Sequence, residues 1–123
     1  MTIVVVDDSP MILRMLCMAL ESADYEVATA EDGEEALARI REHQPPLVLL
    51  DAMMPKLDGY QVCASVRGDA SIIPQPHVIM LTASGNEADR QRAEDAGVNE
   101  FMTKPFRPSQ LLERVEEVLN AAS

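Results

Sequence analysis

Five apolar segments of strand length alternate along the chain with five expected helices, four of which show clear helical apolar spacing. Strict alternation of this kind predicts a doubly wound α/β fold, in which a parallel sheet carries helices on both faces and the crossovers are right-handed. The expected strands are residues 2–6, 25–29, 47–51, 77–82 and 98–103. The expected helices are residues 10–22, 33–43, 60–66, 87–96 and the segment from Pro108 onward. With 123 residues and no linker, repeat or low-complexity tract, the chain is expected to form one domain, residues 1–123.

The third strand is an apolar run without alternation, residues 47–50, that ends in a single carboxylate, Asp51. Such a run is typical of a strand buried on both faces, and open α/β sheets bind ligands beyond the carboxyl ends of their strands. Other polar residues at predicted strand ends are Asp7, Asp8, Thr82 and Lys104. Each of them alone has an ordinary explanation as a cap, a turn residue or a solvated charge. Their coincidence at one edge of the sheet predicts a functional site.

The chemistry of these side chains favours a hard cation and a phosphoryl group. Three clustered carboxylates need a counter-charge, and oxygen ligands without histidine or cysteine are typical of Mg²⁺, with Mn²⁺ as an alternative ion. His43 and His77 lie outside the cluster, which argues against zinc. Carboxylates are known phosphoryl acceptors, and a metal can neutralise the charge that develops during transfer. Lys104 and the Thr82 hydroxyl suit the phosphoryl oxygens.

Composition limits the classes of binding partner and the cellular compartment that we expect. A net charge of −11 argues against nucleic acid or an anionic membrane as a direct partner. The two cysteines, Cys17 and Cys63, lie among apolar neighbours and are expected to be free, buried thiols in a reducing compartment. No signal-peptide pattern and no apolar run of about 20 residues is present, so the chain is expected to be soluble and cytoplasmic.

The chain resembles the receiver domains of two-component response regulators, including the chemotaxis regulators, over essentially its whole length. The residues that carry the resemblance are Val5-Val6-Asp7-Asp8-Ser9, Leu49-Leu50-Asp51-Ala52-Met53-Met54-Pro55 with Asp58-Gly59, Leu81-Thr82-Ala83 and Lys104-Pro105-Phe106. The resemblance implies a flavodoxin-like sheet of five strands in the order 2-1-3-4-5, an order for which chemotaxis regulators are a standard example.

The resemblance also implies roles for individual residues. Asp51 matches the phosphoacceptor. Asp7, Asp8, Asp51 and the backbone carbonyl of Met53 match the Mg²⁺ ligands. Thr82 matches a switch hydroxyl and Lys104 the lysine that contacts the phosphoryl oxygens. Phe101 occupies the aromatic position expected to turn inward when that hydroxyl moves, and the Lys104–Pro105 bond is expected to be cis.

Three features beyond this motif set carry expectations of their own. Met53 is apolar where some relatives place a residue that can position water, so loss of the phosphoryl group is expected to be slow. Ser84 is small and neutral and is expected to add no charge to the mouth of the site. The helix at 87–96 has only a thin stripe, Ala88, Ala93 and Ala96, and is expected to be weakly anchored. It is either part of a switch face with the fifth strand and last helix or simply a solvated crossover helix.

The predicted function is a phosphorylation-activated signalling module that is not an enzyme beyond promoting its own phosphorylation and dephosphorylation. Its partners are expected to be a histidine kinase or phosphotransfer protein and a downstream target or covalently linked output domain. A small Mg²⁺-dependent phosphohydrolase is the alternative, although such enzymes commonly carry a second aspartate where this chain has Met53. A nucleotide- or flavin-binding domain would need a glycine-rich loop in place of Asp7-Asp8-Ser9-Pro10. No output segment follows Ser123, so the chain is expected to be a stand-alone regulator or an excised receiver.

Overall fold

The computed structural model of the chain describes residues 2–83 and 85–121 and contains one parallel sheet with the strand order β2-β1-β3-β4-β5. Its strands are β1 (Thr2–Val6), β2 (Glu26–Ala30), β3 (Leu47–Asp51), β4 (His77–Thr82) and β5 (Glu100–Thr103). The predicted fold class and strand order are therefore confirmed.

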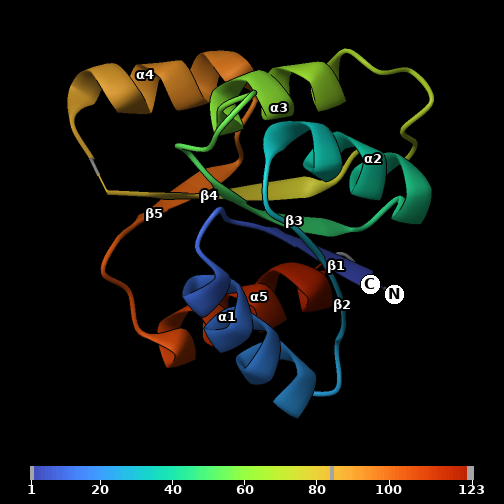
Figure 1. Cartoon of the computed structure of the whole chain (residues 1–123), viewed down its shortest axis with the longest axis vertical. Coiled ribbons are helices and arrows are strands. Elements are labelled where there is room, and N and C mark those ends of the chain that lie inside the picture. The colour runs from blue at the N-terminus through green and yellow to red at the C-terminus, as the bar shows by residue number, and fades with distance from the viewer. Residues whose placement is uncertain (1, 84, 122–123) are drawn as a thin grey trace.

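Helices lie on both faces of the sheet (Figure 1). They are α1 (Pro10–Ser22), α2 (Gly33–His43), α3 (Gly59–Arg67), α4 (Glu87–Ala96) and α5 (Pro108–Ala121). One face is covered by α2, α3 and α4 and the other by α1 and α5 (Figure 1). Strand residues alternate between two apolar clusters, so that Val4 and Val48 pack toward α2–α4 while Ile3 and Leu49 pack toward α1 and α5.

Three predicted boundaries differ slightly from the structure. The second strand lies one residue later than expected, and α3 begins at Gly59 because Asp58 and Gln61 form a capping box in front of it. The fifth strand starts at Glu100 and not at residue 98, because at the level of Asn99 it is a side chain and not a backbone carbonyl that accepts from β4. The Asn99 side chain accepts from the Val78 N–H at 2.7 Å.

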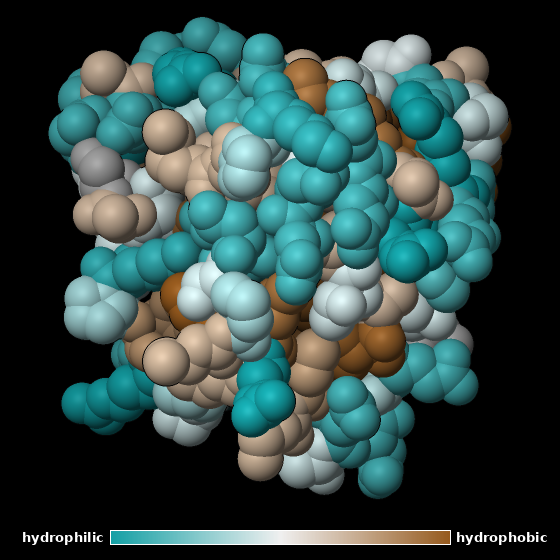
Figure 2. Space-filling model, viewed as in Figure 1, coloured by the Kyte–Doolittle hydropathy of each residue, from teal (hydrophilic) through white to brown (hydrophobic). Residues whose placement is uncertain are grey.

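The surface in Figure 2 is mostly hydrophilic on the viewed face, with apolar atoms in small areas. None of the described helices has the length and apolar composition that crossing a lipid bilayer requires. Both cysteines are free thiols. Cys63 is buried as expected, whereas Cys17 is only half-buried because it lies beside the inward stripe of α1 and not within it.

Gly59 brings the start of α3 against the end of β3. A Cβ atom built on Gly59 would lie 2.3 Å from the Asp51 carbonyl oxygen and 3.0 Å from the Ala52 Cα, and both are backbone atoms that cannot move aside cheaply. The Gly59 N–H also donates to the Ala52 carbonyl at 2.9 Å. Gly59 therefore fixes the position of the loop that follows Asp51.

Substituting Gly59 with alanine is expected to lower the free energy of unfolding by about 1–3 kcal/mol, because the new methyl group overlaps the backbone of β3. Gly68→Ala is the matched control, since the nearest atom to its Cβ would be the Ala64 carbonyl oxygen at 3.5 Å. Urea unfolding of both variants measures the difference. Equal stability of the two variants would contradict the close approach.

Candidate functional site

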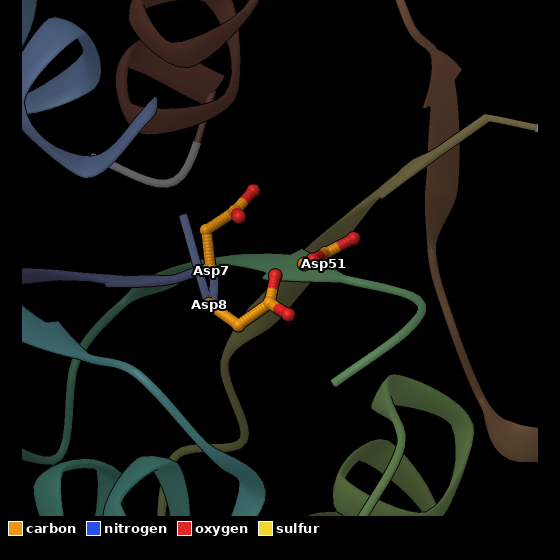
Figure 3. Close-up of side chains that lie close together, drawn as sticks. All are labelled: Asp7, Asp8 and Asp51. Carbon is orange, nitrogen blue, oxygen red and sulfur yellow. The ribbon is translucent and has the colours of Figure 1, made fainter. Parts of the chain in front are cut away.

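Three carboxylates meet at the carboxyl edge of the sheet (Figure 3). One oxygen from each of Asp7, Asp8 and Asp51 lies within 4.8 Å of the others. Asp7 and Asp51 are buried, with 1% and 5% of their surface exposed, whereas Asp8 faces solvent. The cluster therefore has two oxygen donors inside the protein and one at the opening.

Strand register explains why these residues meet. Val6 of β1 pairs with Leu50 of β3 in the parallel ladder, so the next residue of each strand is an aspartate at the same level of the sheet. The Asp7 carboxylate also accepts from the Ser9 N–H at 2.9 Å, which orients it as the chain turns into α1. Parallel strands thus deliver the carboxylates side by side.

Lys104 reaches into the cluster from the end of β5. Its Nζ lies 3.2 Å from an oxygen of Asp7 and 3.2 Å from an oxygen of Asp51. Its own N–H donates to the Thr82 carbonyl at 2.7 Å, and the Lys104–Pro105 peptide bond is cis. Burial alone would lower the pKa of Lys104, but the charges of Asp51 and Asp7 outweigh burial and raise it. The ammonium is therefore held in its charged form.

The pKa of the Asp51 carboxyl is nevertheless raised above that of an ordinary aspartate. Burial, and next the charge of Asp7, raise its pKa from the ordinary 3.8 to about 6, although Lys104 opposes both effects. A single ammonium thus only partly compensates three carboxylates. The site retains an excess of negative charge that a divalent cation would neutralise.

The two predicted switch residues lie toward α3 and α4. Thr82 is buried, with 6% exposure. Burial raises the pKa of the Tyr60 phenol, and a side-chain hydrogen bond with Thr82 opposes that rise. Phe101 is half-buried, and the Arg90 guanidinium carbon stands 4.6 Å from the centre of its ring. The structure thus joins Asp7, Asp8, Asp51 and Lys104 directly, while these two residues have partners on the α4 side.

Met53 lies at the mouth of the site. Its side chain is 68% exposed, and its N–H points to the Asp51 carboxylate at 3.4 Å. The β3–α3 loop that carries it is also tied to α2, because Lys56 lies 3.5 Å from Asp32. Ser84, the other residue expected near the mouth, lies outside the described residues.

The contacts that hold α4 against the rest of the fold were not predicted from the sequence. Ala93 is buried and Ala96 half-buried, but Ala88 is exposed, so the stripe is thinner than expected. Two arginines add contacts instead: Arg90 stacks on Phe101, and Arg92 stacks on Tyr60. The scarcity of aromatic residues, 3% of the chain, was the signal that could have drawn attention to these rings.

Comparison with known proteins identifies the family. A family model described as "Response regulator receiver domain" matches residues 3–116. The chain belongs to this family. It is a receiver domain of two-component systems, a family of signalling phosphoacceptors that interact with histidine kinases.

Relatives and solved structures agree with this assignment. The receiver domain is 45% identical over 120 residues to the probable transcriptional regulator ycf27 of Porphyra purpurea, covering 98% of this chain and 48% of that protein. It is 42% identical over 117 residues to the alkaline phosphatase synthesis transcriptional regulatory protein PhoP of Bacillus subtilis, covering 95% and 48%. The chain spans about half the length of the curated relatives it matches. The Vibrio cholerae chemotaxis protein CheY4 superposes with a TM-score of 0.87 at 32% identity, covering 95% of this chain and 97% of that one.

Proposed function

We propose that this receiver domain accepts a phosphoryl group on Asp51 from the phosphohistidine of a histidine kinase or phosphotransfer protein, or from a small phosphodonor. The observation that carries the proposal is the contact of Lys104 with both Asp51 and Asp7 beside Asp8 at one edge of the sheet. These side chains combine an acceptor carboxylate, a fixed cation and oxygen donors for a metal.

The donor set fits Mg²⁺, and Mn²⁺ as a substitute. The described residues offer carboxylates from Asp7, Asp8 and Asp51 in this cluster, without histidine or cysteine. The exposure of Asp8 leaves room for water ligands, and the backbone carbonyl of Met53 is proposed as a further oxygen donor. A bound Mg²⁺ would neutralise charge that develops on the transferred group.

Asp51 acts in this proposal as the nucleophile. An oxygen of its carboxylate attacks phosphorus, a new P–O bond forms, and the P–N bond of phosphohistidine or the P–O bond of an acyl phosphate breaks. The donor's imidazole or carboxylate leaves with the bonding electrons. The Lys104 ammonium lies 3.2 Å from Asp51 before transfer and is placed to bind an oxygen of the arriving group.

The phosphoryl group is proposed to change partner binding through Thr82, Phe101 and the face formed by α4, β5 and α5. Because the curated relatives named above regulate transcription and are about twice as long, a linked output domain or separate target would receive the signal. The receiver domain is proposed to promote only its own phosphorylation and dephosphorylation. The phosphohydrolase alternative is not favoured, because the family model and the relatives are those of signalling receivers.

The test is incubation with acetyl phosphate and Mg²⁺, followed by intact mass spectrometry. A phosphoryl-sized gain that requires Mg²⁺ and is absent from Asp51→Ala supports the proposal. Absence of a gain in the unmodified chain would refute it. Turnover of a generic phosphate ester by the same sample would instead favour the phosphohydrolase.

Met53 is expected to slow loss of the phosphoryl group. Its exposed apolar side chain stands two residues after Asp51 and offers no hydrogen bond to an attacking water. Met53→Asn is therefore expected to shorten the phosphoryl lifetime, measured as decay of the phosphorylated mass after the donor is removed. A lifetime of minutes or less in the unmodified chain that this substitution leaves unchanged would contradict the role.

A further inference from the structure

Helix α4 is fastened to the rest of the fold mainly by polar contacts. Ala93 is its only buried side chain among the described residues. The neighbouring residue Arg92 instead reaches across to the first turn of α3. Its guanidinium carbon lies 4.2 Å from the centre of the Tyr60 ring, and its nitrogen lies 3.1 Å from an oxygen of Asp58.

Both partners of Arg92 flank the point where α3 touches β3, the strand that ends in Asp51. Asp58 caps α3 and Tyr60 is its second residue, while Gly59 between them packs on the Asp51 carbonyl. Tyr60 is buried, with 6% exposure, so Arg92 covers a side chain that belongs to the core. The contact therefore links α4 to the backbone that carries Asp51.

Tyr60 also lies beside the predicted switch hydroxyl. Burial and Asp89 raise the pKa of its phenol, whereas Arg92 and a side-chain hydrogen bond with Thr82 oppose the rise. Thr82 faces the same apolar cluster as Tyr60, on the α2–α4 side of the sheet, because its strand neighbours Val78 and Met80 do. Movement of Thr82 toward a group on Asp51 would take its hydroxyl away from the phenol.

We propose that Arg92, stacked on Tyr60 and paired with Asp58, is a positioning residue that latches α4 to α3 and favours the unphosphorylated arrangement of Thr82. The inference rests on the proposed function at Asp51. An interaction present in one of two states shifts the equilibrium toward that state. Removal of the latch therefore frees α4 and makes the phosphorylated arrangement easier to reach.

The test compares Arg92→Met with Arg41→Met. Arg41 of α2 pairs at 3.0 Å with Asp69, two residues after the end of α3, so the control removes the same charge from an ion pair that does not involve α4. Asp58→Asn keeps a side-chain cap for α3 but weakens the pair with Arg92. Tyr60→Phe keeps the ring under Arg92 and removes the phenol oxygen beside Thr82.

Two readouts are measured on the whole unphosphorylated chain: hydrogen exchange of the amides of residues 87–96, and the rate of phosphorylation by acetyl phosphate with Mg²⁺. We expect Arg92→Met to raise both by roughly threefold to tenfold. Asp58→Asn shifts both in the same direction by less. Tyr60→Phe accelerates phosphorylation with little change in exchange, and Arg41→Met changes neither.

Faster exchange in Arg92→Met with an unchanged or slower phosphorylation rate would overturn the inference, because a merely structural contact would behave in that way. Unchanged exchange would overturn it as well. If the unmodified chain takes up no phosphoryl group, the proposed function fails and with it the link to Thr82. In that case the exchange data still decide whether Arg92 holds α4.

Discussion

Replacing Lys104 with methionine is expected to slow phosphorylation of Asp51 by acetyl phosphate by about a hundredfold or more. Loss of one well-placed donor to a developing negative charge has effects of this order in other transfer reactions. Lys104 is partly buried and contacts both Asp7 and Asp51 at 3.2 Å, so no solvent cation can take its position with the same geometry. The measurement is the rate of mass gain at saturating Mg²⁺.

Lys56→Met is the matched control for Lys104. The Lys56 ammonium also contacts two carboxylates, those of Asp32 and Glu34, each at 3.5 Å, but its side chain is 55% exposed and lies outside the cluster. The Lys56→Met variant is expected to be phosphorylated at nearly the rate of the unmodified chain. Similar rates for the two variants would show that charge near the mouth matters and that the position of Lys104 does not.

Asp51→Asn is expected to stabilise the metal-free fold at neutral pH by about 3 kcal/mol. The pKa of Asp51 is raised from 3.8 to about 6, and each unit corresponds to about 1.4 kcal/mol. The folded chain therefore binds the Asp51 proton more tightly than the unfolded chain does. The contribution of Asp51 to the free energy of unfolding falls as pH rises from about 4 to about 6 and stays low above that range.

Urea unfolding in a chelating buffer from pH 4 to pH 8 measures this effect. The stability gap between Asp51→Asn and the unmodified chain should be small near pH 4 and reach its full size above about pH 6. Asp69→Asn is the control of opposite sign. Ser71 and Arg41 lower the pKa of Asp69 to about 2, so its loss should destabilise the fold at neutral pH. A gap for Asp51→Asn that is independent of pH would contradict the buried, ionised carboxylate.

The sheet could be predicted because its physical causes are local in the sequence. Unbroken apolar runs such as residues 47–50 indicate buried strands, and the caps at Ser9 and Asp32 mark where helices begin. The meeting of Asp7 with Asp51 then followed from parallel strands that end at the same level. The exact register of the paired residues, by contrast, could not be predicted, because it depends on packing between segments far apart in the chain.

The contacts of α4 could not be predicted in the same way. Most of α3, all of β4 and half of α4 lie between Tyr60 and Arg92 in the sequence, and no apolar spacing or short motif connects an arginine to one ring. The Arg67 guanidinium is a second example: it donates to the Gly97 carbonyl at 2.9 Å and to the Pro76 carbonyl at 2.8 Å, and so joins the end of α3 to the α3–β4 and α4–β5 connections. Polar contacts of this kind arise only once the sheet has placed the helices.

Peptide mapping of the phosphoryl group decides whether Asp51 is the acceptor. After reaction with acetyl phosphate and Mg²⁺, the aspartyl phosphate is reduced with borohydride and the chain is digested for peptide mapping. The modification is expected at Asp51 alone and at background level in Lys104→Met. A phosphoryl group on a serine, threonine or histidine, or a chain without modification, would contradict it.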